Sequence, residues 1–325
     1  MILCHCLLLL PSALSRWYSV FVTYINLITF SGFVFSFGYI YNKAYFLKTE
    51  TLSCKYLKSN AKTLLAFYIS GFFYRLLVYP GRWLTPKEYV DLLVLGDIPG
   101  FSEFLISFFL FSMMFFIFYK PIKNYILCNN LLFVFCVLTS LALTFLPYQI
   151  FWINQVGLLF GSTRFCAFPV FQYSSFFLIG MYFSKYKVIF NIKIFMISLL
   201  ATVTFFLYVL IHHDFPGRFP PSIWWILGCW FFIYLYYLFA KFLANGSKLI
   251  NMLNIIGENT LLYLVISNIC IFALKRSGSL EPSKSIIVGI LLIAMIYFFV
   301  SIIRKPSTQI ADKLNKVGQR RKKKS

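Results

Sequence analysis

The sequence predicts an all-α fold, a polytopic transmembrane helical bundle with about ten spans. The chain of 325 residues is 60% hydrophobic and only 12% charged, and its mean hydropathy is +0.80. Its apolar residues come in blocks close to the roughly 20 residues that a helix needs to cross a bilayer. The sequence lacks the two-residue alternation of a transmembrane β-barrel, and no polar stretch is long enough for a soluble domain. We therefore predict one membrane domain, residues 1–303, followed by a basic tail, residues 304–325.

The predicted spans follow one another with short polar connections. They cover residues 1–14, 18–40, 64–79, 103–119, 125–146, 168–184, 188–211, 222–240, 260–274 and 285–303. The first is shorter than a bilayer requires, so we expect it to continue upstream of Met1, as in an N-terminally truncated chain. The alternative is a signal peptide cleaved near Ser15. Such peptides carry a positive residue before the apolar run, and this run has none before it.

The net charge of +21 reflects membrane topology in this chain rather than nucleic-acid binding. Most lysines and arginines lie in alternate connections that hold few acids, namely residues 43–62, 120–123, 185–187, 241–248 and the tail. Loops rich in lysine and arginine usually face the cytoplasm, which places both termini there. The tail is expected to lie near anionic lipid headgroups or in solvent. Membrane lipids are thus a predicted partner, and nucleic acid is not.

A polar and stiff loop, Ile211–Ser222 (IHHDFPGRFPPS), separates two long apolar runs. Such a loop is where an integral membrane protein can meet a polar substrate, and the alternative is an ordinary loop at the water interface. It carries Asp214 and Arg218, and two other predicted outer loops carry Arg82 and Arg164. Guanidinium groups suit carboxylate, phosphate or diphosphate recognition. We therefore expect these four residues to bind substrate, although arginines can also simply extend to the membrane interface.

His5 is the strongest single candidate because it lies within an apolar run. If the first span ends on the outside near Ser15, His5 lies roughly 15 Å deeper, at about 1.5 Å per residue. An ionisable group at that depth is costly unless it faces the interior of the bundle, so a functional role is the first hypothesis. A neutral imidazole can take the proton of a hydroxyl that attacks a thioester. The alternative is a histidine that only hydrogen-bonds to a neighbouring helix.

The eight cysteines indicate neither a disulfide framework nor a metal site. Most of them lie within apolar spans, and no CxxC spacing occurs. Cys4, His5 and Cys6 are too compact for a tetrahedral metal site on their own. The sequence predicts no metal and no bound cofactor.

Several short pieces, in order along the chain, resemble motifs of the acyltransferase 3 family, membrane-bound O-acyltransferases that modify surface polysaccharides. The pieces are MILCH (residues 1–5, similar to the end of the family's first-helix motif), SFGYI (36–40, FxSGY), KTLL (62–65, a basic run before the third helix), FFLIGMY (176–182, FFxxGxY), RFPP (218–221, [KR]YPP) and IGENTL (256–261, IGxxSL). Their order and spacing agree with the family over nearly the whole chain.

The resemblance implies transfer of an acyl group, usually acetyl, from cytoplasmic acyl-CoA to a hydroxyl of a lipid-linked or extracytoplasmic glycan. It also implies a multi-pass protein of the bacterial cytoplasmic membrane. The family's essential first-helix histidine corresponds to His5, and the basic residue that accompanies it would lie upstream of Met1. The chain departs from the family at Ser267, where a histidine is usual, and at Phe37, where a serine is usual.

Two other functions are compatible with the sequence. A degenerate family member would assist an active enzyme without catalysing transfer itself. A polysaccharide polymerase-like or translocase-like protein would share the aromatic spans and outer arginines but would not need a histidine within the membrane. Replacement of His5 by alanine distinguishes acyl transfer from translocation, because acyl transfer depends on that residue and translocation does not.

Overall fold

The computed structural model describes residues 1–12, 16–46, 54–79, 85–162, 165, 167–243 and 248–322. These residues form helices and turns without a strand, apart from an isolated bridge between Pro11 and Leu280. The predicted all-α membrane fold is therefore confirmed at the level of its class.

The helices of the described ranges are α1 (Ile2–Leu9), α2 (Arg16–Tyr41), α3 (Cys54–Val78), α4 (Pro86–Leu93), α5 (Glu103–Ile117), α6 (Tyr119–Pro121), α7 (Asn130–Ala142), α8 (Asn154–Phe160), α9 (Val170–Lys185), α10 (Ile192–His212), α11 (Ile223–Gly228), α12 (Trp230–Leu243), α13 (Lys248–Glu258), α14 (Thr260–Ser277) and α15 (Pro282–Lys322). Each predicted span coincides with one helix or with two consecutive helices. Apolar blocks of this length become helices because a helix satisfies its own backbone hydrogen bonds within lipid.

Six helices of the described chain are long and apolar enough to cross a membrane: Trp17–Tyr45, Tyr56–Val78, Ile192–His212, Ile223–Leu243, Thr260–Ser277 and Pro282–Ile302. A seventh span results if α5 and the segment Tyr119–Ile126, which meet at a 74° bend, count as one. Helices α1, α7 and α9 have 8, 13 and 16 residues, fewer than the roughly 20 that span a bilayer. The count of ten spans and the cytoplasmic location of the termini therefore stay predictions.

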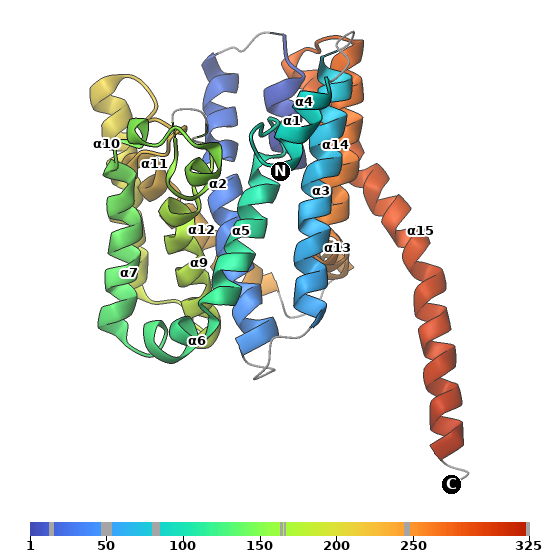
Figure 1. Cartoon of the computed structure of the whole chain (residues 1–325). Helices are drawn as coiled ribbons and strands as arrows, with labels where there is room; N and C mark the ends of the chain where they lie inside the picture. Colours follow the sequence, from blue (N-terminus) through green and yellow to red (C-terminus); the bar gives the residue numbers. More distant parts are fainter. Residues whose placement is uncertain are drawn as a thin grey trace.

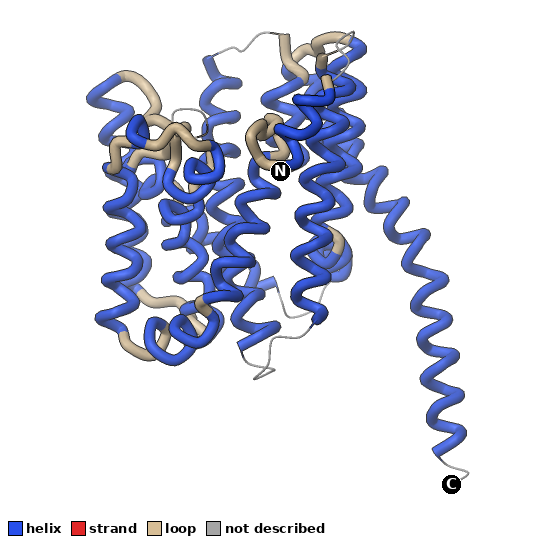
Figure 2. The backbone as a smooth tube through the Cα atoms, in the orientation of Figure 1, coloured by secondary structure: helices blue, strands red, loops and turns tan. Residues whose placement is uncertain are grey.

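The helices form two groups joined by a central pair (Figure 1). One group contains α7, α9, α10, α11 and α12, and the other contains α1, α3, α14 and α15. Helices α2 and α5 lie between them, and both contact α9. Turns and loops gather at the two ends of the bundle (Figure 2). This arrangement packs α1 against α14 and α15, which lie far from it in sequence, and α1 also contacts α2.

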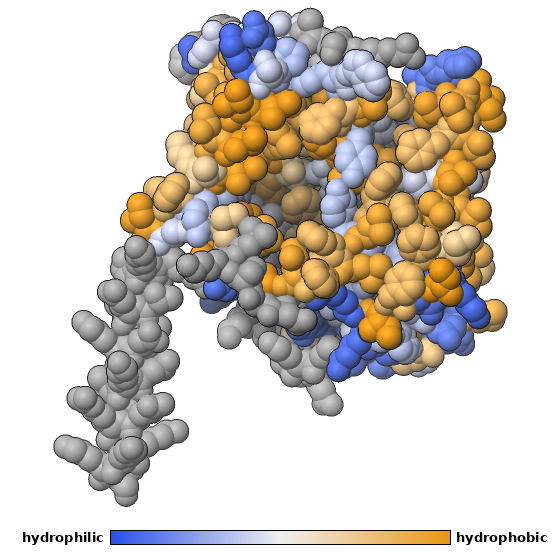
Figure 3. Space-filling model, turned by 180° about the vertical axis from the view of Figure 1, so that it is seen from behind, coloured by the Kyte–Doolittle hydropathy of each residue, from blue (hydrophilic) through white to orange (hydrophobic). Residues whose placement is uncertain are grey.

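The surface is divided in the way a bilayer requires. Figure 3 shows an apolar band across the face in view, with hydrophilic residues above and below it. Large apolar side chains are strongly exposed on the helices, including Leu131, Ile197 and Phe298 at 83%, 68% and 65% of their surface. So large a continuous apolar surface would be unfavourable in water. It therefore identifies the face covered by membrane lipid.

Helices α2 and α9 approach each other closely through two glycines. A Cβ on Gly38 would lie 2.8 Å from the carbonyl carbon of Phe177, and one on Gly180 would lie 3.0 Å from that of Phe35. Small residues at such crossings let two membrane helices pack backbone against backbone. Both glycines belong to motifs singled out in the sequence, SFGYI and FFLIGMY, so these two motifs meet in the fold.

Candidate functional site

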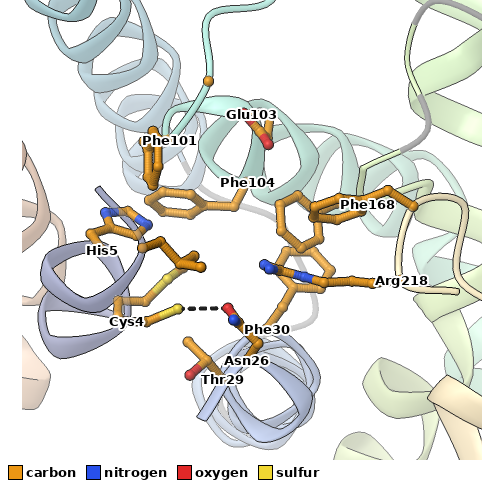
Figure 4. A pocket seen from close by; sticks show the side chains of 14 residues that line it. Cys4, His5, Asn26, Thr29, Phe30, Phe101, Glu103, Phe104, Phe168 and Arg218 are labelled. Carbon is orange, nitrogen blue, oxygen red and sulfur yellow. Dashed lines mark hydrogen bonds between the residues drawn. The ribbon is translucent and has the colours of Figure 1, made fainter. Parts of the chain in front are cut away.

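A cavity of about 130 Å³ lies where α1, α2 and the start of α5 meet the loop that follows α10. The close-up in Figure 4 shows side chains from all of these segments pointing toward it. Its polar lining residues are Cys4, His5, Asn26, Thr29, Glu103 and Arg218, and most of the others are aromatic or aliphatic. The cavity is large enough for several water molecules or for the reacting end of a substrate.

Two residues singled out in the sequence, His5 and Arg218, line this same cavity. They come from the first helix and from a loop in the second half of the chain. Asp214 is exposed and is not among the lining residues, and its carboxylate accepts a hydrogen bond from the backbone N–H of Phe215 at 2.7 Å. Arg82 and Arg164 lie outside the described residues. Substrate binding by these last three residues stays a prediction.

His5 is held firmly on one side and is open to the cavity on the other. Only 5% of its surface is exposed, and its Nδ1 lies 2.7 Å from Oδ1 of Asn268 in α14. Its ring packs against Phe101 and Phe104, with ring centroids 5.3 Å and 5.5 Å apart. A histidine fixed in this way presents its second ring nitrogen to the cavity with little freedom to rotate.

Arg218 supplies a positive charge at the opposite wall. Its guanidinium lies 4.3 Å from the ring centre of Phe219 and 5.9 Å from that of Phe168, and it points into the cavity (Figure 4). Within the described part of the chain it forms no ion pair. Burial lowers the pKa of Arg218, an effect opposed by the nearby Cys4 and other groups, but an arginine remains protonated. Glu103 lines the same cavity and acts on this charge without forming a salt bridge with it, so the guanidinium can still bind a negatively charged ligand.

Several lining or supporting residues were not selected from the sequence as site residues. Asn26 accepts a hydrogen bond from the Cys4 thiol at 2.9 Å, and Glu103 begins α5 at the cavity wall. Asn268 is completely buried and reaches His5 from a distant helix. The available signal was a polar side chain within or at the edge of an apolar span, a position where function is a reasonable first hypothesis.

The cavity combines a potential proton acceptor, a cation, a carboxyl group and one side-chain amide within largely aromatic walls. Among the described residues, no group of three or more histidine, cysteine or acidic side chains could hold a metal ion. Proton transfer and anion stabilisation are the two operations for which this cavity holds suitable groups. Comparisons with models of known protein families, with curated proteins and with solved structures give no match.

Proposed function

We propose that this protein is a membrane-bound O-acyltransferase of the acyltransferase 3 type. It would transfer an acyl group, acetyl in the simplest case, from acyl-CoA to a hydroxyl of a cell-surface or lipid-linked polysaccharide. The main support is that His5 and Arg218, two residues of the motifs that resemble this family, line one cavity. A buried imidazole can accept the proton of the attacking hydroxyl, and a guanidinium can stabilise the negative charge that develops, so both groups suit such a transfer.

The reaction follows from the chemistry of these two groups. His5 takes the proton of the acceptor hydroxyl as the oxygen attacks the thioester carbonyl. The new carbon–oxygen bond forms, the carbon–sulfur bond breaks, and the departing thiolate of CoA takes up the proton from the imidazolium. Negative charge develops on the carbonyl oxygen during the attack. Arg218 would stabilise that charge or hold a phosphate of the donor.

The size and walls of the cavity fit the reacting end of such substrates. A volume of about 130 Å³ accommodates a small acyl group with the attacking hydroxyl. The rest of the coenzyme and of the glycan would lie outside it, because complete pockets for ligands of that size are typically several hundred Å³. Phe30, Phe104 and Phe168 form part of the wall and limit the access of water, which would otherwise hydrolyse the thioester.

The test is release of CoA from acetyl-CoA by the purified protein in lipid nanodiscs, with a bacterial polysaccharide fraction as acceptor. We expect release that depends on the acceptor, and a loss of at least about 100-fold in the His5→Ala variant, the usual contribution of a general base. His212→Ala is the matched control, since His212 is exposed and does not line the cavity.

Two outcomes would count against the proposal. Equal rates in the wild type and His5→Ala would remove the proposed base. A wild type that folds but transfers no acyl group to any acceptor fraction would instead favour a non-catalytic family member, or a protein that moves or polymerises the glycan.

A further inference from the structure

We infer that Asn268 is a positioning residue that holds His5 in the tautomer with its proton on Nδ1. The inference rests on the proposed function, in which His5 is the general base. In that tautomer Nε2 carries the free lone pair and faces the cavity, so the base is ready for the acceptor hydroxyl. A histidine in the opposite tautomer would present an N–H to the hydroxyl and could not accept its proton.

The orientation of the Asn268 amide is fixed by its other partners. Its Nδ2 lies 3.1 Å from the backbone oxygen of Phe101 and 2.9 Å from Oγ of Ser70. A backbone carbonyl can only accept a hydrogen bond, so the amide nitrogen must face Phe101. The amide oxygen of Asn268 therefore faces His5.

The tautomer of His5 follows from this orientation. The amide oxygen is an acceptor and lies 2.7 Å from Nδ1 of His5. If Nδ1 lacked a proton, two acceptors would face each other at that distance in a buried site, which is strongly unfavourable. Nδ1 must therefore donate to Asn268. No hydrogen bond from the described residues reaches Nε2, which remains free to act on a ligand in the cavity.

The surrounding network makes the amide rigid. Ser102 donates to Ser70 at 2.8 Å, and Ser70, Ser102 and Asn268 are all completely buried. The network joins α3, α14 and the segment that leads into α5, and His5 adds α1. A buried polar network in which each member has a partner specifies a single arrangement. The position of the base is thus set by four segments of the chain that lie far apart in sequence.

The first experiment reads the tautomer without any assay of activity. The chain contains three histidines, so replacing His212 and His213 by glutamine leaves His5 as the one labelled histidine in ¹⁵N NMR. We expect the spectrum of the Nδ1–H tautomer, and a mixture of tautomers once Asn268→Ala is added. An Nε2–H spectrum in the parent protein, or an unchanged spectrum in Asn268→Ala, would overturn the inference.

The second experiment measures acyl transfer. Asn268→Ala should lower kcat about 10- to 100-fold with little change in KM, the usual effect of losing a residue that orients a reacting group. Asn268→Asp keeps an acceptor toward Nδ1 and should retain more activity, with the pH–rate profile displaced to higher pH because a carboxylate favours the imidazolium. An unchanged kcat in folded Asn268→Ala would refute the positioning role.

Asn60→Ala separates positioning from general stability. Asn60 is also a buried asparagine that joins α3 to α5, but it does not line the cavity. A purely structural role for Asn268 predicts similar losses of kcat and of thermal stability in both variants, whereas positioning predicts a loss of kcat only for Asn268→Ala. If the wild type shows no acyl transfer, the proposed function fails, and the NMR result still decides the tautomer.

Discussion

Replacing Gly38 by alanine tests whether the α2–α9 crossing holds the bundle together. The added Cβ would lie 2.8 Å from the carbonyl carbon of Phe177 and closer still to its oxygen. These are backbone atoms of α9, so no change of side-chain rotamer can relieve the contact. The two helices would have to move apart.

The size of the effect follows from this distance. Carbon atoms in ordinary contact lie about 3.5–4.0 Å apart, so the helices must separate by about 1 Å. Overpacking of this kind typically costs about 1–3 kcal/mol, and lost contacts along the crossing add to that. Gly32 lies on the same helix, and a Cβ there meets nothing within 4 Å. Gly32→Ala should instead raise the stability of α2 by about 0.5–1 kcal/mol, because alanine favours a helix over glycine.

The assay is thermal unfolding of both variants in the same detergent, followed by circular dichroism and by size-exclusion chromatography. We expect a lower midpoint for Gly38→Ala and an equal or higher midpoint for Gly32→Ala. If the two variants unfold at the same temperature, the close approach of α2 and α9 is not the contact that limits stability, and this reasoning is wrong.

Two further predictions concern the charged groups. Arg218→Lys should lower kcat/KM for acyl transfer about 3- to 30-fold, because lysine keeps the charge but loses the planar stacking on Phe219, while Arg276→Lys on the exposed end of α14 should have no effect. Arg75→Gln should lower the free energy of unfolding by about 1–2 kcal/mol, because both oxygens of Asp97 bind this guanidinium in a half-buried site. Lys284→Gln, which breaks the exposed pair with Glu281, should change the free energy of unfolding by less than about 0.5 kcal/mol. Chemical denaturation of both variants measures the two values. Equal losses would contradict a stabilising role for the Arg75–Asp97 pair.

The sequence predicted where most helices lie, but not the angles at which consecutive helices meet. Apolar block length was sufficient to locate α10, α14 and the first half of α15, because the lipid requirement for internal hydrogen bonds leaves few alternatives. The span expected over residues 103–119 matches α5, which ends two residues earlier, and the chain then turns by 74° into the segment Tyr119–Ile126. Pro121 lies just beyond this break and lacks the N–H that a continuing helix would use. Hydropathy locates the end of such a helix but not the angle at which the next one follows.

Only part of the candidate site could be predicted from the sequence. His5 and Arg218 could be selected because an ionisable side chain beside or within an apolar run is unusual. Asn268 gave only a weak signal, since a neutral amide in an apolar span resembles the polar residues that commonly join membrane helices. Its importance depends on a contact with a residue 263 positions away in the chain. Partners at that distance are determined by the packing of α1 against α14, which a single sequence does not reveal.

His5 and Arg218 lie on different helix groups, so the packing of the bundle sets the distance between them. His5 belongs to the helix group of α1, α3, α14 and α15, where Asn268 fixes it. Arg218 follows α10 and belongs to the other group. Helix α2 contributes Asn26 to the cavity between them and is fixed to α9 by the glycine crossing. The distance between His5 and Arg218 therefore depends on how the two groups pack across α2, so a change at Gly38 should alter the proposed acyl transfer without touching the cavity.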